Sequence, residues 1–384
     1  MTVSSQRVPA HRERPMARHR PAHLVIAATA HGYGHVTQVA AVAHGLRRRD
    51  PHLRITLAAS VDPGFARERM PPGTTWLDRA LDVALPMDGP LKVEWEAGLT
   101  TYAAFDADHA AHLAAQRAWL AGLAPDLVLA DIPWLPLAAA RALGIPAVAL
   151  CSLSWLDILA ESPVGAKLPA SLVRHMRDAY GGAELFLRPA PSMPMSWLPN
   201  GRDVGPIADV RPRDPAALRQ RLGVAADTRL VLVQFGGAGS VMPSADLSLP
   251  PKTLLLTPVP QLAERLGAVL IGPTAGPGGL AVADVLACSD AVITKPGYGT
   301  FAEAACHGVP VLSVPRGDWP EEPHLDVWLA RQVPYRSVPP ATLAAGHIAE
   351  PLSELFAAGP VAPVPATGIA ETVELLWPWL ARGA

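Results

Sequence analysis

A glycine-rich turn near the start of the chain carries two histidines, His31 and His35, on either side of Gly32-Tyr33-Gly34. The turn follows an apolar run at 23–29 and leads into a helical pattern, which predicts a strand, a tight turn and a helix. Histidine is the natural general base near neutral pH, so His35 is a candidate for removing a proton from a hydroxyl. The alternative is a structural or helix-capping role. A dinucleotide motif is disfavoured because Thr37 stands where its third glycine would be.

Asp131 ends another apolar run, at 126–131, and is a candidate partner for such a histidine. The carboxyl ends of parallel strands meet at one edge of a sheet, where a carboxylate can hold an imidazole in orientation. Capping of the following helix, or a plain loop position, is the alternative role of Asp131. His35 and Asp131 are the predicted catalytic residues.

The strongest local signal is a second glycine-rich loop, Thr294-Lys-Pro-Gly-Tyr-Gly-Thr-Phe-Ala-Glu303, which follows an apolar run and opens a short helix. Gly297 and Gly299 allow the backbone to turn sharply and to approach a ligand closely. Free backbone N–H groups and the positive end of the helix dipole suit a pyrophosphate. Because Lys295 adds a positive charge at the same place, the loop predicts a phosphate-binding site.

Two other interpretations of this loop remain open from the sequence. The pattern Gly297-x-Gly299-x-x-Ala302 matches the dinucleotide fingerprint, although the unit from 291 to 314 has 24 residues, fewer than the roughly 30 of such a unit. Thr300 with Glu303 also forms a capping box, which needs no ligand.

Two further loops follow apolar runs. The polar loop Pro315-Arg-Gly-Asp-Trp-Pro-Glu-Glu-Pro-His324 contains Glu321 and Glu322, which either favour the N-terminus of the next helix or accept hydrogen bonds from sugar hydroxyls. The run at 230–235 leads into Gly236-Gly237, a glycine turn that we group with the same candidate site.

These loops need a scaffold that brings strand ends together. Short apolar runs alternate with helical patterns in both halves of the chain, which predicts the α/β class with two Rossmann-like, doubly wound parallel sheets. Two such sheets facing each other form an inter-domain cleft at the carboxyl ends of their strands, where ligands of open α/β sheets bind.

The predicted organisation has five parts. They are a basic, disordered tail at 1–22, an N-terminal domain at 23–190, a proline-rich linker at 191–215, a C-terminal domain at 216–370 and a closing helix at 371–384. The linker assignment rests on seven prolines between 189 and 215.

The composition disfavours several classes of protein. With 384 residues, a net charge of −2 and 17% charged residues, the chain has no electrostatic footprint for nucleic acid. We find no apolar run long enough for a membrane span or a signal peptide, and the three cysteines lie far apart. We therefore predict a cytoplasmic protein without disulfides or a metal site, whose oligomeric state the sequence does not indicate. The absence of H-E-x-x-H, G-x-S-x-G and P-loop motifs disfavours zincin, α/β-hydrolase and P-loop chemistry.

In this order, the signals resemble the glycosyltransferase B (GT-B) superfamily, which includes the peptidoglycan GlcNAc-transferase type and the UDP-glycosyltransferases. The chain is most similar to the glycosyltransferase-like domain that precedes the kinase in plant-type L-arabinokinases. The similarity covers 23–335 and rests on His31-Gly-Tyr-Gly-His35, Leu81-Asp-Val-Ala-Leu-Pro, Lys295-Pro-Gly-Tyr-Gly-Thr300 and Glu321-Glu-Pro-His-Leu325. Many relatives carry a histidine near the pyrophosphate, where this chain has Lys295-Pro296. We find no glycine- and serine-rich phosphate loop of the kinase half.

The resemblance implies a role for each matching residue. His35 deprotonates the acceptor hydroxyl and Asp131 steadies it, with His31 and Gly34 on the acceptor side. The residues that the resemblance assigns to the donor are Gly297, Gly299, Thr300, Glu303, Glu321 and Glu322. Among these, Glu303 matches the glutamate that commonly binds the ribose, and the Glu321-Glu322 pair matches the residues that read the donor sugar. We add Gly236, Gly237 and Lys295 to the predicted donor-binding residues from the sequence itself.

The implied function is a metal-independent, inverting transfer of a sugar from a nucleoside-diphosphate sugar to a small-molecule acceptor with a hydroxyl. UDP is favoured as the nucleotide by resemblance alone, and no cofactor is expected. Two alternatives stay open. One is a UDP-sugar epimerase, which shares the two-domain plan. The other is a binding or regulatory module that senses a nucleotide sugar without turnover.

Overall fold

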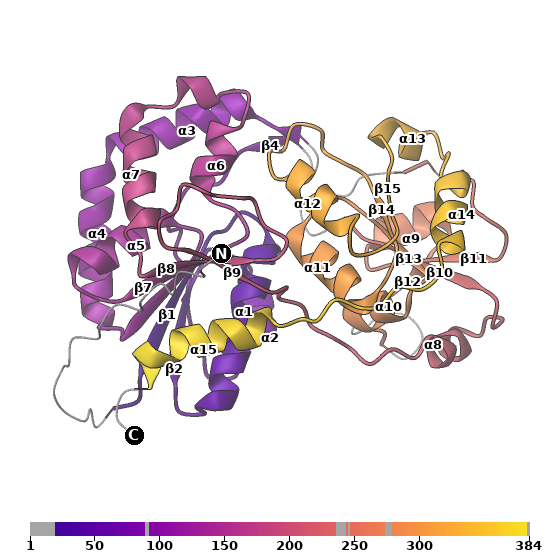
Figure 1. Ribbon diagram of the computed structural model, residues 1–384, viewed down its shortest axis with the longest axis horizontal. Helices are drawn as coiled ribbons and strands as arrows, with labels where there is room; N and C mark the ends of the chain where they lie inside the picture. Colours follow the sequence, from indigo (N-terminus) through magenta and orange to yellow (C-terminus); the bar gives the residue numbers. More distant parts are fainter. Residues whose placement is uncertain (1–19, 89–91, 236–242, 245, 273–278, 382–384) are drawn as a thin grey trace, which may run out of the picture.

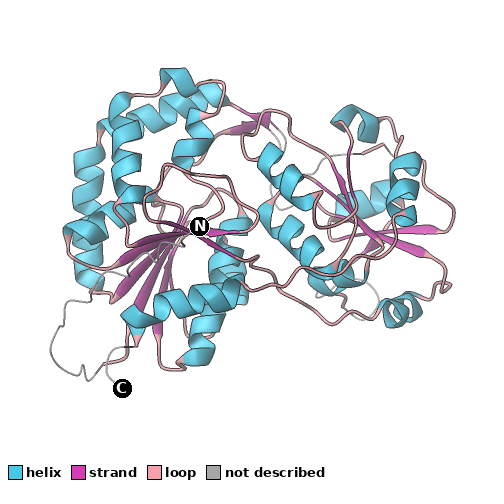
Figure 2. Cartoon of the chain, viewed as in Figure 1, coloured by secondary structure: helices cyan, strands magenta, loops and turns pink. Residues whose placement is uncertain are grey.

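The computed structural model describes residues 20–88, 92–235, 243–244, 246–272 and 279–381. Two parallel sheets, each with its own helices, occupy the two halves of the molecule (Figures 1 and 2). The predicted α/β class with two doubly wound domains is therefore confirmed. Residues 1–19 of the predicted tail and the glycine turn Gly236-Gly237 lie outside the described residues.

The N-terminal sheet has seven parallel strands in the order β3-β2-β1-β6-β7-β8-β9. Its strands are β1 (His23–Ala28), β2 (Arg54–Ala58), β3 (Thr75–Leu77), β6 (Leu127–Asp131), β7 (Ala147–Leu150), β8 (Leu185–Pro189) and β9 (Gly201–Val204). The central strands are apolar throughout because both faces are covered. On β1, Val25 and Ala27 belong to one core cluster, whereas Leu24 and Ile26 belong to the cluster on the opposite face.

Two groups of helices cover these faces. On one face lie α3 (Trp95–Ala107), α4 (His109–Leu123), α5 (Trp134–Ala142), α6 (Trp155–Ala160), the short 3₁₀ helix η1 (Gly165–Lys167) and α7 (Ala170–Gly181). On the other face lie α1 (Tyr33–Arg49), α2 (Pro63–Arg69) and α15 (Gly368–Leu380). A small antiparallel pair, β4 (Met87–Asp88) and β5 (Lys92–Val93), precedes α3.

The C-terminal sheet has six parallel strands in the order β12-β11-β10-β13-β14-β15. They are β10 (Arg229–Val233), β11 (Thr253–Thr257), β12 (Val269–Leu270), β13 (Ala291–Thr294), β14 (Val311–Ser313) and β15 (Tyr335–Ser337). Its helices are α8 (Pro215–Leu222), α9 (Pro260–Leu266), α10 (Val282–Cys288), α11 (Tyr298–His307), α12 (Glu322–Leu329), α13 (Pro340–Ala344) and α14 (Ala349–Ala357). Here too the central strand faces two cores, with Leu230 and Leu232 in one cluster and Val231 and Val233 in the other.

Each sheet has a point at which the strand order reverses. This switch point lies between β1 and β6 in the N-terminal sheet and between β10 and β13 in the C-terminal sheet. Doubly wound sheets bind ligands outside the carboxyl ends of the strands at such points. The histidine turn follows β1, Asp131 ends β6, and the loop 295–297 follows β13. The fold therefore places the main predicted residues at the two switch points.

Two segments depart from the predicted boundaries. Strand β9 lies inside the predicted linker, because Gly201-Arg-Asp-Val204 is a polar edge strand whose composition resembles that of a loop. Helix α15 begins at Gly368 and packs against α1 of the N-terminal domain (Figure 1). The two helices lie close together at Gly45, where an added Cβ atom would lie 2.8 Å from Val373. The N-terminal domain is therefore built from both ends of the described chain.

Within the described residues, no helix combines the length and the apolar character needed to cross a membrane. The three cysteines are free and buried.

Candidate functional site

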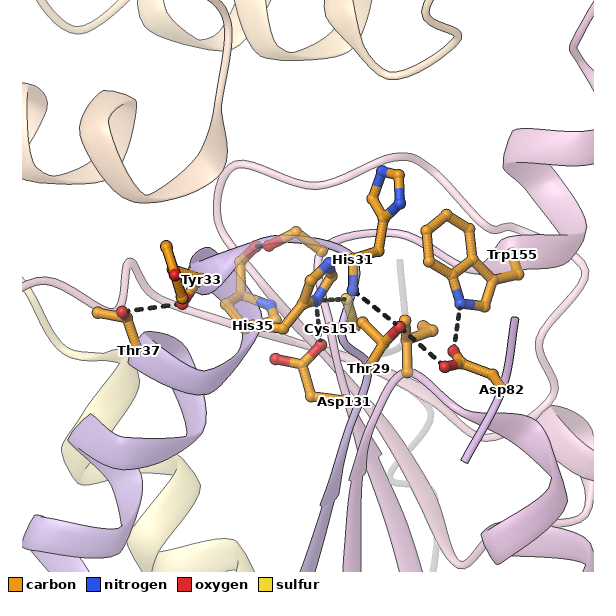
Figure 3. A network of polar contacts seen from close by, with 12 residues as sticks. Thr29, His31, Tyr33, His35, Thr37, Asp82, Asp131, Cys151 and Trp155 are labelled. Atoms are coloured by element: carbon orange, nitrogen blue, oxygen red, sulfur yellow. Dashed lines mark hydrogen bonds and ion pairs between the residues drawn. The ribbon is translucent and has the colours of Figure 1, made fainter. Parts of the chain in front are cut away.

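Two loops at the carboxyl edge of the N-terminal sheet carry the predicted catalytic residues. Gly32, the N-cap of α1, has a φ of 91°, a backbone region that favours glycine. His35 lies in the first turn of α1, and Asp131 is the last residue of β6. Figure 3 shows their side chains meeting at the strand ends.

The imidazole of His35 is held by the carboxylate of Asp131, whose Oδ1 lies 2.8 Å from Nδ1. Asp131 is fully buried, and among the described residues its Oδ2 has no hydrogen-bond partner of normal geometry. The side chain of His35 remains 13% exposed, and no hydrogen bond within the described chain engages its Nε2. This second nitrogen is therefore available to a hydroxyl group from outside the protein.

The electrostatic surroundings make His35 a stronger base. Burial disfavours the charged imidazolium, but the charge and hydrogen bond of Asp131 outweigh burial and raise the pKa of His35 above its ordinary value. The more distant charges of Asp82 and Glu321 act in the same direction. When His35 takes up a proton, the buried Asp131 carboxylate balances the new charge.

Cys151 adds a third polar atom to this pair, with its Sγ 3.9 Å from the same Nδ1 of His35. The donor atoms of His35, Asp131 and Cys151 lie within 4.8 Å of one another, and residues of these types can hold a metal. Burial raises the pKa of the Cys151 thiol well above its usual range, which disfavours the thiolate that a metal or a nucleophilic mechanism requires. We therefore interpret the cluster as a positioned histidine.

A second polar group lies beside this pair (Figure 3). Asp82 accepts hydrogen bonds from Thr29 Oγ1 at 3.0 Å and from Trp155 Nε1 at 2.9 Å. Burial raises the pKa of Asp82 to about 6 despite these hydrogen bonds. The ring of His31 packs edge-on against Trp155 at 5.2 Å, and burial, with nearby positive charges, lowers the pKa of His31 to about 3. His31 is therefore a neutral hydrogen-bonding group at physiological pH.

The predicted phosphate loop lies at the other switch point, between β13 and α11. Gly297 is the N-cap of α11 and contributes no side-chain hydrogen bond to the helix end. The predicted capping box is wrong, because α11 starts at Tyr298 and Thr300 already lies in its first turn. The first backbone N–H groups of a helix have no intrahelical acceptor, so this end suits an anion.

Neither the backbone conformation nor the packing of this loop requires glycine at positions 297 and 299. Neither Gly297 nor Gly299 has a left-handed φ. A Cβ atom at Gly299 would meet no atom within 4 Å, and one at Gly297 would lie 4.0 Å from its nearest neighbour. Open space at a helix N-terminus leaves room for a ligand to approach the backbone.

Two cations lie near the loop. Burial and the charge of Arg316 lower the pKa of Lys295 to about 8, so Lys295 is still mostly protonated at pH 7. Both cations also lower the pKa of His31 in the N-terminal domain. The phosphate loop and the histidine turn are therefore near enough across the domain junction for their charges to interact.

Glu321 and Glu322 are buried and bind Arg316. The carboxylate of Glu322 accepts from Arg316 Nε at 2.6 Å and from the backbone N–H groups of Arg316 and Gly317 at 3.0 and 3.2 Å. Glu321 Oε1 accepts from Arg316 Nη2 at 2.8 Å, whereas its Oε2 has no partner of normal geometry in the described chain. Glu322 therefore holds the loop, whereas Glu321 binds Arg316 and also interacts with the side chain of Tyr298.

Trp319 connects this loop to the N-terminal domain. It is 4% exposed and belongs to an N-terminal core cluster. Its ring stacks on His31 at 5.7 Å and packs against Trp95 at 5.8 Å, and Arg316 lies over it at 4.4 Å. A hydrogen bond of 2.7 Å from Trp95 Nε1 to Asp318 adds to this contact.

Glu303 lies on α11 and faces the domain junction. Burial and the charge of Asp209 raise the pKa of Glu303 to about 7, although Arg69 and Arg211 oppose this shift. Arg69 belongs to α2 of the N-terminal domain and Arg211 to the segment between β9 and α8. Glu303 is therefore a partly buried carboxyl group between the two domains.

The structure brings the histidine turn, Asp131 and the loop residues from 295 to 303 to the same junction, with Gly34 exposed at the start of α1. Gly236 and Gly237 lie outside the described residues. The sequence reasoning assigned no role to Asp82, Arg316 or Trp319. All three lie in stretches that it had singled out, at 81–86 and 315–324, so their position was the available signal.

Comparison with known proteins gives two distant relatives. No protein-family model matches the chain. L-arabinokinase of Arabidopsis thaliana is 29% identical over 314 residues, which cover 79% of this chain and 29% of that protein. The chain therefore spans less than a third of this relative's length. An uncharacterized glycosyltransferase of Methanopyrus kandleri is 29% identical over 252 residues, which cover 59% of this chain and 67% of that protein.

Solved glycosyltransferase structures share the fold over nearly the whole chain. The calicheamicin glycosyltransferase CalG4 has a TM-score of 0.58 at 19% identity, covering 95% of this chain and all of its own. A UDP-glucosyltransferase from Polygonum tinctorium has a TM-score of 0.56 at 16% identity, covering 96% of this chain and all of its own. SnogD of Streptomyces nogalater has a TM-score of 0.55 at 17% identity, covering 94% and 95%.

Proposed function

The chain has the two-domain fold of the GT-B superfamily, and from this premise we propose that it transfers a sugar from a nucleotide sugar to an acceptor hydroxyl. One observation carries the proposal. A histidine held by a buried carboxylate and an open helix N-terminus lie at the two switch points and face the same domain junction. The first arrangement suits proton removal from an acceptor, and the second suits the diphosphate of a donor.

In the proposed mechanism, Nε2 of His35 takes the proton of the acceptor hydroxyl. The acceptor oxygen attacks the anomeric carbon from the side opposite the diphosphate, so the configuration inverts as the bond to the diphosphate breaks. Backbone N–H groups at Gly299 and Thr300 and the Lys295 ammonium group stabilise the charge that develops on the leaving group. These groups act in place of a metal ion, and we propose that the reaction needs none.

The donor assignment rests on a smaller set of contacts. Glu303 lies one turn beyond Gly299 along α11, where it can accept hydrogen bonds from ribose hydroxyls. The buried carboxylate of Glu321, which binds Arg316 and interacts with Tyr298, is the proposed acceptor for a hydroxyl of the donor sugar. UDP is the proposed nucleotide because two solved structures with this fold are described with UDP sugars. One is the UDP-glucosyltransferase from Polygonum tinctorium, and the other is UGT2 of Phytolacca americana, complexed with UDP-2fluoro-glucose.

The activity test uses the EDTA-treated full chain, a panel of UDP-, TDP-, GDP- and ADP-sugars and a panel of small hydroxyl acceptors. Transfer detected by mass spectrometry should fall by roughly 10²–10⁴-fold in His35→Ala. The melting shift produced by the free nucleoside diphosphate should stay unchanged, because the mechanism gives His35 no contact with the diphosphate. Transfer by His35→Ala at the wild-type rate would refute the assigned base.

The same assay separates the alternatives. An epimerase would change the donor sugar with no acceptor present. A binding module would show a nucleotide-dependent melting shift of a few degrees, with neither transfer nor donor hydrolysis.

A further inference from the structure

A cluster of metal-ligand side chains lies outside the proposed active site, where three helices of the N-terminal domain meet. Asp106 is the penultimate residue of α3, His109 begins α4, and His175 lies in the middle of α7. The candidate donor atoms of these three residues all lie within 4.8 Å of one another. We propose that they form a zinc site that fastens the α3–α4 corner to α7.

The geometry converges on the carboxylate. The side chain of Asp106 is only 4% exposed, and its Oδ1 lies 2.7 Å from Nδ1 of His175. The rings of His109 and His175 stack at 3.7 Å with their planes 8° apart. Ligand atoms of a tetrahedral zinc ion lie about 3.3 Å apart, because each zinc–ligand bond is about 2.0–2.1 Å. Because an imidazole lone pair lies in the plane of its ring, zinc binding requires the two rings to tilt out of this stack and the contact between Asp106 and His175 to lengthen.

The chemistry of the set selects the metal. Two imidazoles and one carboxylate are the mixed nitrogen and oxygen ligands that Zn²⁺ accepts, whereas Mg²⁺ and Ca²⁺ prefer oxygen ligands alone. A neutral imidazole offers one ring-nitrogen lone pair to a metal. Three protein ligands leave a fourth position for water.

A neighbouring histidine, His112, makes a different hydrogen bond. Nδ1 of His112, one turn further along α4, lies 3.1 Å from the carbonyl oxygen of Phe105. Its ring stacks on Phe105 at 4.3 Å. His112 therefore supports the backbone at the end of α3, next to Asp106, and is not needed as a ligand.

The position of the cluster gives the metal a structural role. Tyr102, one turn before Asp106 on α3, packs against Trp134 at 6.0 Å and Trp155 at 6.3 Å. Trp155 in turn contacts His31 and donates to Asp82. Zinc at the far end of α3 would fix the helix layer that supports this side of the active site.

The test starts with the EDTA-treated full chain and titrates ZnCl₂ by isothermal calorimetry, with metal content measured after dialysis. We expect one equivalent of zinc to bind and to raise Tm, and equimolar Mg²⁺ to do neither. His109→Ala and His175→Ala should each weaken zinc binding by at least about tenfold. His44→Ala, which removes a partly buried histidine from α1, should leave it unchanged.

Cobalt identifies the ligands. Co²⁺ in the proposed site should give visible d–d bands without the near-ultraviolet band of a cobalt–thiolate bond, and Cys151→Ala should keep both the bands and the affinity. Zinc binding that is lost in Cys151→Ala but kept in His109→Ala would place the metal at His35 and overturn the proposal. Zinc-free protein after dialysis would overturn it as well. Asp106→Asn, which keeps the shape of the side chain, provides a second variant if a histidine substitution unfolds the domain.

Discussion

The carboxylate of Asp131 has one protein partner of normal geometry in the described chain, the imidazole of His35. Because this carboxylate is buried, its energy depends on whether His35 carries a proton, and the Cys151 thiol is a further neighbour of the pair. The raised pKa of His35 is therefore a property of the pair, and it sets the pH range in which the base can work.

We expect the acid limb of kcat/KM to lie above pH 6.5, because a general base acts when unprotonated and Asp131 raises the pKa of His35. In Asp131→Asn this effect is removed while burial remains, so the limb should move to lower pH and the rate should fall. Rates of transfer between pH 5 and 9 measure both effects.

Two matched variants support this measurement. Asp227→Asn, at an exposed site of the C-terminal domain, should keep the wild-type profile. Asp82→Asn shows how much of the profile comes from Asp82, whose pKa of about 6 lies in the same range. An acid limb at the same pH in Asp131→Asn as in wild type would contradict the coupled pair.

The raised pKa of Glu303 should make the protein less stable as pH rises. An ion-paired carboxylate, whose pKa is lowered, has the opposite effect. Its pKa is raised from 4.5 to about 7, so between these values the folded protein holds a proton that the unfolded chain has released. Stability is therefore lost as pH rises through this range. At pH 8, Glu303→Gln should be more stable than wild type by about 2–3 kcal/mol, with little difference at pH 4.

Urea titrations at the two pH values measure this effect. Glu264→Gln, at an exposed position on α9, is the matched control and should show no pH-dependent gain. Equal stability of Glu303→Gln and wild type at pH 8 would mean that Glu303 is ionised in the folded protein at no cost.

At the scale of elements, a substitution in the first turn of α11 should weaken ligand binding without lowering the stability of the fold. Gly299 is the second residue of this helix, with open space where a Cβ would be. Gly299→Ala should therefore fold as well as wild type, and alanine should stabilise the helix by roughly 0.5–1 kcal/mol. Binding of the nucleoside diphosphate should weaken at least tenfold, because a methyl group would enter the space proposed for the phosphates.

Gly122→Ala is the control for this prediction. Gly122 lies inside α4, and a Cβ there would also meet no atom within 4 Å. The Gly122→Ala variant should gain similar stability and keep the wild-type affinity for the nucleoside diphosphate. Melting curves and calorimetric titrations measure these two quantities. Unchanged affinity in Gly299→Ala would remove the phosphate loop from the proposed site.

The sequence predicted those elements whose residues are buried on both faces. β1, β6, β10 and β13 are continuous apolar runs, so they and the loops that follow them were found. The edge strands β3, β9 and β15 contain exposed or partly exposed residues and do not differ from loops by composition. The capping-box alternative for Thr300 and Glu303 has the right spacing but is wrong, because α11 begins at Tyr298 and Thr300 lies inside its first turn. The pairing of Glu322 with Arg316 depends on the fold of the loop, which no pattern encodes.

At the scale of the whole molecule, one tryptophan connects the two domains. Trp319 comes from the C-terminal domain and is buried in an N-terminal core cluster. Trp319→Ala should cost about 3–5 kcal/mol of packing free energy and loosen the junction. We expect a lower Tm and a larger radius of gyration in small-angle X-ray scattering.

Trp328→Ala is the comparison, because Trp328 packs against a C-terminal cluster. It should lower stability without changing the radius of gyration. A Trp319→Ala protein that matches wild type in both quantities would show that other contacts hold the domains together.

The contact between α15 and α1 has a consequence for synthesis of the chain. Ribosomes release domains from the N-terminus, and a domain usually folds once its own residues have emerged. Here the N-terminal domain is not complete until α15 has emerged, after every strand of the C-terminal sheet. Until then, the face of α1 around Gly45 lacks the helix that covers it in the folded protein. The N-terminal domain is therefore completed only after the C-terminal sheet has been synthesised. During that time the nascent chain carries the uncovered apolar face of α1.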